Sequence, residues 1–105
     1  MAIKVLIVDD EQSARDLCVE ILHRMGFQTE TAESGARALE VMEREPVDIV
    51  LSDVRMPGLS GIELLKIIRQ KYPETDVVMM TGFGTIQASV EAIKLGAYDY
   101  LTKPF

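Results

Sequence analysis

The sequence predicts an α/β protein in which helices cover both faces of a parallel sheet, a doubly wound arrangement. Short apolar runs of strand length alternate with stretches in which apolar residues recur every three or four positions, which is the pattern of βα units. Most of the strand runs are apolar almost throughout, as expected for strands that are buried on both faces. The length of 105 residues fits a single small domain.

Five strands and four helices are expected in strict alternation. The strands are predicted over Ile3–Val8, Gln28–Ala32, Val47–Ser52, Asp76–Met80 and Tyr98–Leu101. The helices are predicted over Gln12–Met25, Gly35–Arg44, a segment that begins after Ser60 and ends near Tyr72, and Thr85–Leu95. The second strand is polar, so we place it at an edge of the sheet.

Capping residues and apolar stripes support these helices. Ser34 and Ser60 are candidate N-caps, and Glu63 completes a capping-box pattern with Ser60. Gly26 is placed to end the first helix. One apolar stripe of the first helix is expected to face the sheet, and it comprises Ala14, Leu17, Cys18, Ile21, Leu22 and Met25.

Composition narrows the classes of protein to consider. The net charge of −6 argues against a nucleic-acid partner, because phosphate backbones attract basic surfaces. No apolar run approaches the roughly 18 residues of a membrane helix, and the N-terminal residues lack the pattern of a signal peptide. Cys18 is the single cysteine, so no intrachain disulfide can form. We therefore expect a cytoplasmic protein without a membrane segment.

Acidic, hydroxyl and basic side chains follow four of the predicted strands. Asp9 and Asp10 follow the first strand, Asp53 the third, Thr81 the fourth and Lys103 the fifth. Strands of a parallel sheet end at the same edge, where the ligand sites of open α/β sheets form, so these side chains are expected to converge. Three neighbouring carboxylates repel one another without a counter-charge, which a divalent cation and Lys103 would supply.

These residue types fit phosphoryl transfer. A carboxylate can act as a nucleophile toward phosphorus, and Asp53 is the best candidate. Mg²⁺ or Mn²⁺ takes oxygen ligands of this kind, while Thr81 and Lys103 can bind phosphate oxygens. Each residue alone has an ordinary explanation, such as a helix cap for Asp10 or a surface position for Lys103. Their joint occurrence at four strand ends favours a functional site.

The same residues resemble the receiver domain of two-component response regulators. The matching segments are residues 7–11, 51–58, 80–82 and 98–105, and the resemblance covers essentially the whole chain. Residues 81–105 are most similar to the receivers of nitrogen-regulation-type activators. The resemblance implies a flavodoxin-like sheet with strand order 2-1-3-4-5.

The C-terminal end departs from the family pattern. Receivers have a fifth helix after the segment that corresponds to Lys103-Pro104-Phe105, and this sequence stops there. We therefore expect a single receiver domain over residues 1–105 that is truncated at its C-terminus, with four helices. Apolar strand surface would then be exposed, and it could mediate self-association or be covered by a partner.

The resemblance implies a phosphoacceptor switch that catalyses only its own phosphorylation and dephosphorylation. Asp53 would take a phosphoryl group from a phosphohistidine of a sensor histidine kinase. The expected Mg²⁺ ligands are Asp9 (mostly through water), Asp10, Asp53 and the main-chain carbonyl of Arg55. Thr81 and Lys103 would bind the phosphoryl oxygens.

The same resemblance implies a change of surface on phosphorylation. Thr81 and Tyr100 would move, and they would alter the surface near the fourth helix and the fifth strand. This change would control an output domain or a partner, with transcription regulation as the expected process.

Three other functions fit these residues less well. A phosphatase with an aspartyl intermediate would carry a second acid two residues after the nucleophile, where this sequence has Arg55. A flavodoxin-like cofactor binder would need a phosphate-binding loop after the first strand, where Asp9, Asp10 and Glu11 would repel phosphate. An interaction domain without phosphorylation would not need the combination of Asp10, Asp53, Thr81 and Lys103.

Overall fold

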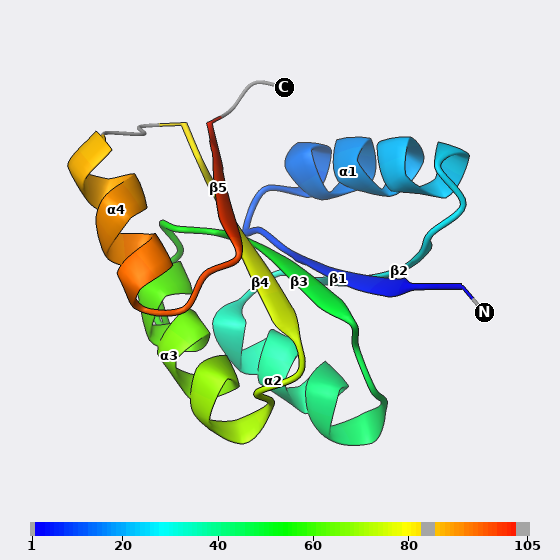
Figure 1. Cartoon of the computed structure of the whole chain (residues 1–105). Helices are drawn as coiled ribbons and strands as arrows, with labels where there is room; N and C mark the ends of the chain where they lie inside the picture. The colour runs from blue at the N-terminus through cyan, green and yellow to red at the C-terminus, as the bar shows by residue number, and fades with distance from the viewer. Residues whose placement is uncertain (1, 83–85, 103–105) are drawn as a thin grey trace.

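The chain forms five strands that alternate with four helices over the part that the computed structural model describes, residues 2–82 and 86–102. Figure 1 shows the elements in chain order. They are β1 (Lys4–Val8), α1 (Gln12–Arg24), β2 (Gln28–Ala32), α2 (Gly35–Arg44), β3 (Ile49–Asp53), α3 (Gly61–Lys71), β4 (Asp76–Thr81), α4 (Ile86–Lys94) and β5 (Asp99–Thr102).

The bounds of most elements differ from the sequence prediction by one or two residues, and two of the differences concern the site. Asp53 and Thr81 were expected just after their strands, but they are the last residues of β3 and β4. Both continue the main-chain pairing of the sheet, since Asp53 is paired with Met80 and Thr81 with Thr102. The strands therefore extend beyond the apolar runs that predicted them.

All five strands are parallel and lie in the order β2-β1-β3-β4-β5. The resemblance implied this order, and the polar strand β2 lies at an edge as predicted. β1 has β2 on one side and β3 on the other, so the strand order reverses between β1 and β3. Ligands of open α/β sheets bind outside the carboxyl ends of the strands at such a point.

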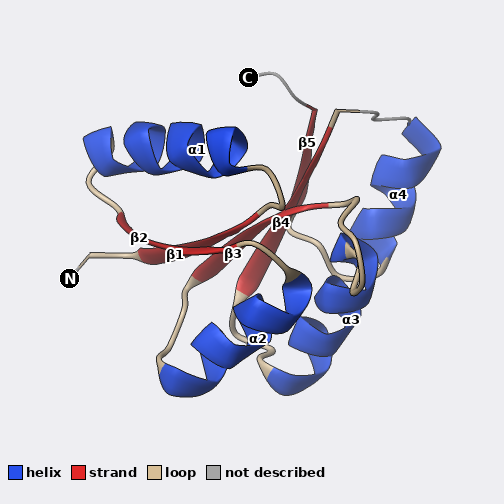
Figure 2. Ribbon diagram, turned by 180° about the vertical axis from the view of Figure 1, so that it is seen from behind, coloured by secondary structure: helices blue, strands red, loops and turns tan. Residues whose placement is uncertain are grey.

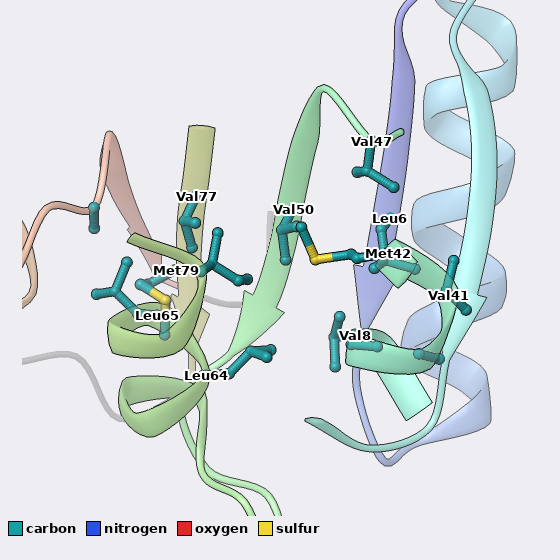
Figure 3. Packing of buried hydrophobic residues seen from close by; sticks show 14 of the residues in the cluster. Leu6, Val8, Val41, Met42, Val47, Val50, Leu64, Leu65, Val77 and Met79 are labelled. Atoms are coloured by element: carbon teal, nitrogen blue, oxygen red, sulfur yellow. The ribbon is translucent and has the colours of Figure 1, made fainter. Parts of the chain in front are cut away.

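The helices form two unequal layers. Figures 1 and 2 show α1 on one face of the sheet and α2, α3 and α4 on the other. The larger core fills the space between the sheet and α2–α4, and Figure 3 shows its packing. Its strand residues include Leu6, Val8, Val50, Val77 and Met79, which pack against Val41, Met42, Leu64 and Leu65 of the helices. A smaller core beneath α1 contains Val5, Ile7, Cys18 and Met80.

Capping interactions fix the start of α2 and α3 as the sequence predicted. The Ser34 hydroxyl accepts a hydrogen bond from the Arg37 main-chain nitrogen at 3.1 Å. Ser60 and Glu63 form a reciprocal capping box, with both hydrogen bonds at 3.2 Å. Both helices thus begin on satisfied main-chain donors.

The expected burial of the apolar stripe on α1 is wrong for three of its residues. Cys18 is buried, but Leu17, Ile21 and Met25 have exposed fractions of 50%, 37% and 65%. In the described part of the chain α1 has no neighbouring helix on its face of the sheet (Figure 1). Only the side of α1 that faces the strands is therefore buried, while the adjoining side is open.

The same face of the sheet is incompletely covered beyond α1. Ile49, Leu51 and Val78 are half-buried there, and Leu101 of β5 has an exposed fraction of 37%. Apolar strand surface is thus exposed, as the sequence led us to expect. None of the helices in the described residues is long and apolar enough to span a membrane.

Candidate acidic phosphoryl site

Three carboxylates meet at the carboxyl ends of β1 and β3. One carboxylate oxygen from each of Asp9, Asp10 and Asp53 lies within 4.8 Å of the other two. The register explains this meeting, because Val8 of β1 is paired with Ser52 of β3 and each of them is followed in the chain by an aspartate. Asp9 and Asp53 are buried and Asp10 is exposed.

Asp9 is held by hydrogen bonds on its main chain and on its side chain. Its nitrogen donates to the Ala32 carbonyl at 3.1 Å. One carboxylate oxygen of Asp9 accepts a hydrogen bond from the Glu11 nitrogen at 3.0 Å. The main-chain carbonyl of Asp9 accepts a hydrogen bond from Nη1 of Arg15 at 2.7 Å. The loop between β1 and α1 is therefore built around this one residue.

Asp10 does not cap α1. Glu11 is the N-cap residue of this helix, and it makes no side-chain capping hydrogen bond. The ordinary explanation for Asp10, that of a helix cap, is therefore wrong. Its carboxylate instead belongs to the acidic cluster.

Asp53 is fixed by contacts with its own strand and with the loop that follows. Its carbonyl accepts a hydrogen bond from the Ser52 hydroxyl at 3.0 Å. Its carboxylate oxygen Oδ1 accepts from the Arg55 nitrogen at 3.3 Å. The next residue, Val54, donates its N–H to the Met80 carbonyl at 2.9 Å, which ties the end of β3 to β4. Arg55 itself is exposed beside the cluster.

The other expected site residues lie at the next strand ends or beyond the described residues. Thr81 is the last residue of β4 and has an exposed fraction of 2%. It directly follows Met80, which is paired with Asp53 in the sheet. Tyr100 of β5 is half-buried and packs against the larger core. Lys103 lies outside the described residues, directly after Thr102, the last residue of β5.

The cluster suits a divalent cation. It offers carboxylate oxygens alone, and such oxygens are the ligands that Mg²⁺ prefers. Two of the three carboxylates are buried side by side, an arrangement in which like charges repel strongly unless a counter-charge is close. Asp9, Asp10 and Asp53 therefore form an acidic pocket whose donor set fits Mg²⁺.

Sequence reasoning did not single out two residues next to this pocket. Gly61 begins α3 against the main chain of Asp53, and Arg15 of α1 donates to the carbonyl of Asp9. Both contacts are made to main-chain atoms. A glycine after a serine N-cap and an arginine in the first turns of a helix are common, so composition alone carries no signal for either.

The fold and the pocket together define a class of protein. A parallel sheet ordered 2-1-3-4-5 that carries clustered aspartates at its switch point and a buried threonine at the next strand end is the architecture of receiver domains. The family model described as "Response regulator receiver domain" matches residues 5–105. The chain therefore belongs to this family, whose members are signalling domains and not classical enzymes.

Relatives of known name agree with this assignment. The chain is 44% identical over 101 residues to the response regulator protein PilR of Pseudomonas aeruginosa. The matched segment covers 96% of this chain and 23% of PilR. It is 43% identical over 101 residues to the DNA-binding transcriptional regulator NtrC of Escherichia coli, with coverage of 96% and 22%. The chain thus spans about a fifth of the length of these relatives, and the resemblance to nitrogen-regulation-type receivers is confirmed.

Solved structures show the same fold. The chemotaxis protein CheY4 of Vibrio cholerae superposes with a TM-score of 0.94 at 34% identity, covering all of this chain and 89% of that one. The receiver domain of NtrX from Brucella abortus superposes with a TM-score of 0.91 at 41% identity, covering 96% of this chain and 86% of that one.

Proposed function

We propose that this receiver domain is a phosphoacceptor switch in which Asp53 takes a phosphoryl group from a phosphohistidine of a sensor histidine kinase. The observation that carries the proposal is the position of Asp53, a buried carboxylate at a strand end whose oxygens lie within reach of those of Asp9 and Asp10. Membership of the receiver family supports the same role.

The proposed transfer exchanges one bond to phosphorus for another. A carboxylate oxygen of Asp53 attacks phosphorus and forms an O–P bond while the P–N bond of the phosphohistidine breaks. The imidazole nitrogen keeps the electron pair of that bond and takes a proton. In the second half of the cycle, a water oxygen attacks the phosphorus of the aspartyl phosphate and gives up a proton while the O–P bond to Asp53 breaks, which releases inorganic phosphate and restores the Asp53 carboxylate.

The other site residues provide charge and hydrogen bonds. Asp9, Asp10, Asp53 and the main-chain carbonyl of Arg55 would hold Mg²⁺ or Mn²⁺. When bound, the cation supplies positive charge that offsets the repulsion between the carboxylate and the incoming phosphoryl group. The Thr81 hydroxyl donates to a phosphoryl oxygen, and Lys103 pairs with the same group.

The proposed signal travels from Thr81 to β5. Thr81 is paired with Thr102 in the sheet, so a shift of Thr81 toward the phosphoryl group also acts on the strand that carries Tyr100. Tyr100 is half-buried and would move further into the protein, which changes the surface formed with α4. This surface would control an output domain in a cytoplasmic regulator of transcription, a role that the name of the relative NtrC suggests.

The intact mass of the protein after incubation with acetyl phosphate and Mg²⁺ tests this function. We expect one phosphoryl group on the wild type and on Asp16→Asn, an exposed position on α1. No adduct is expected on Asp53→Asn or when EDTA replaces Mg²⁺. An adduct that persists on Asp53→Asn, or its absence from folded wild-type protein, would contradict the proposal.

A further inference from the structure

Arg15 reaches back from α1 to the loop that carries two of the three acids. It is half-buried, and its Nη1 donates to the main-chain carbonyl of Asp9 at 2.7 Å. This is a short hydrogen bond from a charged donor, a kind about twice as strong as one between neutral groups. The Arg15 main-chain nitrogen also donates to the Glu11 carbonyl at 3.1 Å, so Arg15 contacts the loop at both of its ends.

The carbonyl that Arg15 binds belongs to the peptide unit between Asp9 and Asp10. The Asp9 nitrogen and carboxylate are already bound to Ala32 and Glu11, so Asp9 stays in place. A peptide unit is planar, so rotation about the Cα–C bond of Asp9 would carry the Cα atom and the side chain of Asp10 with it. The orientation of the exposed Asp10 carboxylate thus depends on the bond that Arg15 makes.

Arg15 shares the task of holding this peptide unit with the Asp9 carboxylate, which accepts from the Glu11 nitrogen across it. Glu11 is the N-cap residue, and it makes no side-chain capping hydrogen bond. By contrast, α2 and α3 are fixed at their starts by Ser34 and Ser60. Ser34 and Ser60 accept hydrogen bonds from the main chain of their helices, whereas at α1 the guanidinium of Arg15 donates to the loop and ties it to the helix.

We propose that Arg15 is a positioning residue of the acidic pocket, which fixes the Asp9–Asp10 peptide unit and so aims the Asp10 carboxylate at the cation. This inference rests on the proposed function and adds to it a residue that touches neither cation nor phosphate. Removal of a side chain that orients the ligands of a metal ion weakens the affinity of the site for that ion by about 10–100-fold.

A purely electrostatic role predicts the opposite result. A positive charge beside three carboxylates disfavours the binding of a cation, so its removal alone would strengthen Mg²⁺ binding. The sign of the change in Mg²⁺ affinity therefore separates positioning from charge.

The test compares Arg15→Gln, Arg15→Lys and the matched control Arg24→Gln. Arg24 lies in the last turn of α1, where it pairs with Glu20 on the surface, so its substitution removes the same charge away from the pocket. Mg²⁺ affinity is measured by NMR titration of the metal-free proteins, together with hydrogen exchange of the Glu11 amide and the melting temperature.

We expect Arg15→Gln to bind Mg²⁺ about tenfold more weakly and to exchange the Glu11 amide faster. Arg15→Lys, which keeps a charged donor, recovers part of the affinity, and Arg24→Gln matches the wild type. Unchanged or tighter binding by folded Arg15→Gln overturns the inference. Equal losses in the Gln and Lys variants that follow their melting temperatures also overturn it, because they indicate a role in folding only.

Failure of the proposed function can be distinguished from failure of the inference about Arg15. If wild-type protein neither binds Mg²⁺ nor accepts a phosphoryl group, the proposed function is wrong, and the role of Arg15 falls with it. If the wild type does both and Arg15→Gln behaves identically, only the inference about Arg15 is wrong.

Discussion

Gly61, the first residue of α3, lies directly against the main-chain carbonyl oxygen of Asp53, and a methyl group at position 61 would overlap that oxygen. The same methyl group would come within 2.9 Å of the Val54 Cα atom and of the Met79 side chain. The Gly61 nitrogen donates to the Val54 carbonyl at 3.0 Å. The absence of a side chain at position 61 thus allows α3 to begin against the strand end that carries the proposed phosphoacceptor.

Gly61→Ala is expected to destabilise the protein by about 1–3 kcal/mol, the usual range for overpacking, and to slow phosphorylation by acetyl phosphate. The added methyl group must displace main-chain atoms of Asp53 and Val54. Gly35→Ala is the matched control, since Gly35 also follows a serine N-cap but its added methyl group would meet the side chain of Leu59. Urea denaturation that shows equal losses for the two variants would contradict this account.

Ser60→Ala is expected to lower the free energy of unfolding by about 1 kcal/mol, because the Glu63 nitrogen loses its capping acceptor. Ser13→Ala removes an exposed hydroxyl from α1 and should change stability by less than about 0.5 kcal/mol. Chemical denaturation of both variants checks this, and a loss for Ser13→Ala as large as that for Ser60→Ala would speak against the capping box.

Mg²⁺ is expected to stabilise the folded protein. At ten times its dissociation constant, a ligand that binds only the folded state adds about 1.4 kcal/mol. The cation would bind the three carboxylates only where the fold brings them together. Thermal melts with Mg²⁺ and with EDTA measure the shift, which Asp10→Asn should reduce. A shift of the same size in Asp10→Asn would place the cation elsewhere.

Leu17→Ala is expected to destabilise the protein far less than Leu64→Ala. Leu17 is half exposed on α1, whereas Leu64 has an exposed fraction of 0% in the larger core. Truncating a buried leucine costs about 2–5 kcal/mol, and a surface substitution about 0.5 kcal/mol or less. Chemical denaturation at several protein concentrations measures the loss of stability in each variant. A large, concentration-dependent loss for Leu17→Ala would instead indicate that α1 is covered by a second copy of the chain.

The order of the elements and the convergence of Asp9, Asp10 and Asp53 could be predicted from the sequence. Apolar runs of strand length mark buried parallel strands, and the geometry of a parallel sheet places the residues after them at one edge. Ser34 and Ser60 predicted the starts of α2 and α3, and Gly26 predicted the end of α1 within a residue, because capping depends on local chemistry.

The burial of α1 and the contacts of Arg15 and Gly61 could not be predicted in the same way. Periodicity shows which residues share a face of a helix, but the width of the buried strip depends on which other elements lie beside it. Leu17 and Ile21 therefore look like core residues in the sequence although they are exposed. Arg15 and Gly61 act on main-chain atoms, whose positions only the folded chain defines.

The acids of the pocket lie at strand ends and on the loops next to them, whereas the broad outer surfaces belong to the helices. The exposed residues Glu20 and Glu40 form ion pairs with Arg24 and Arg37 of their own helices. Such a division lets the recognition surface diversify by mutation while the reaction centre is inherited unchanged. Versions of this domain could therefore come to recognise different partners through substitutions at exposed helix positions alone, with the acidic pocket kept.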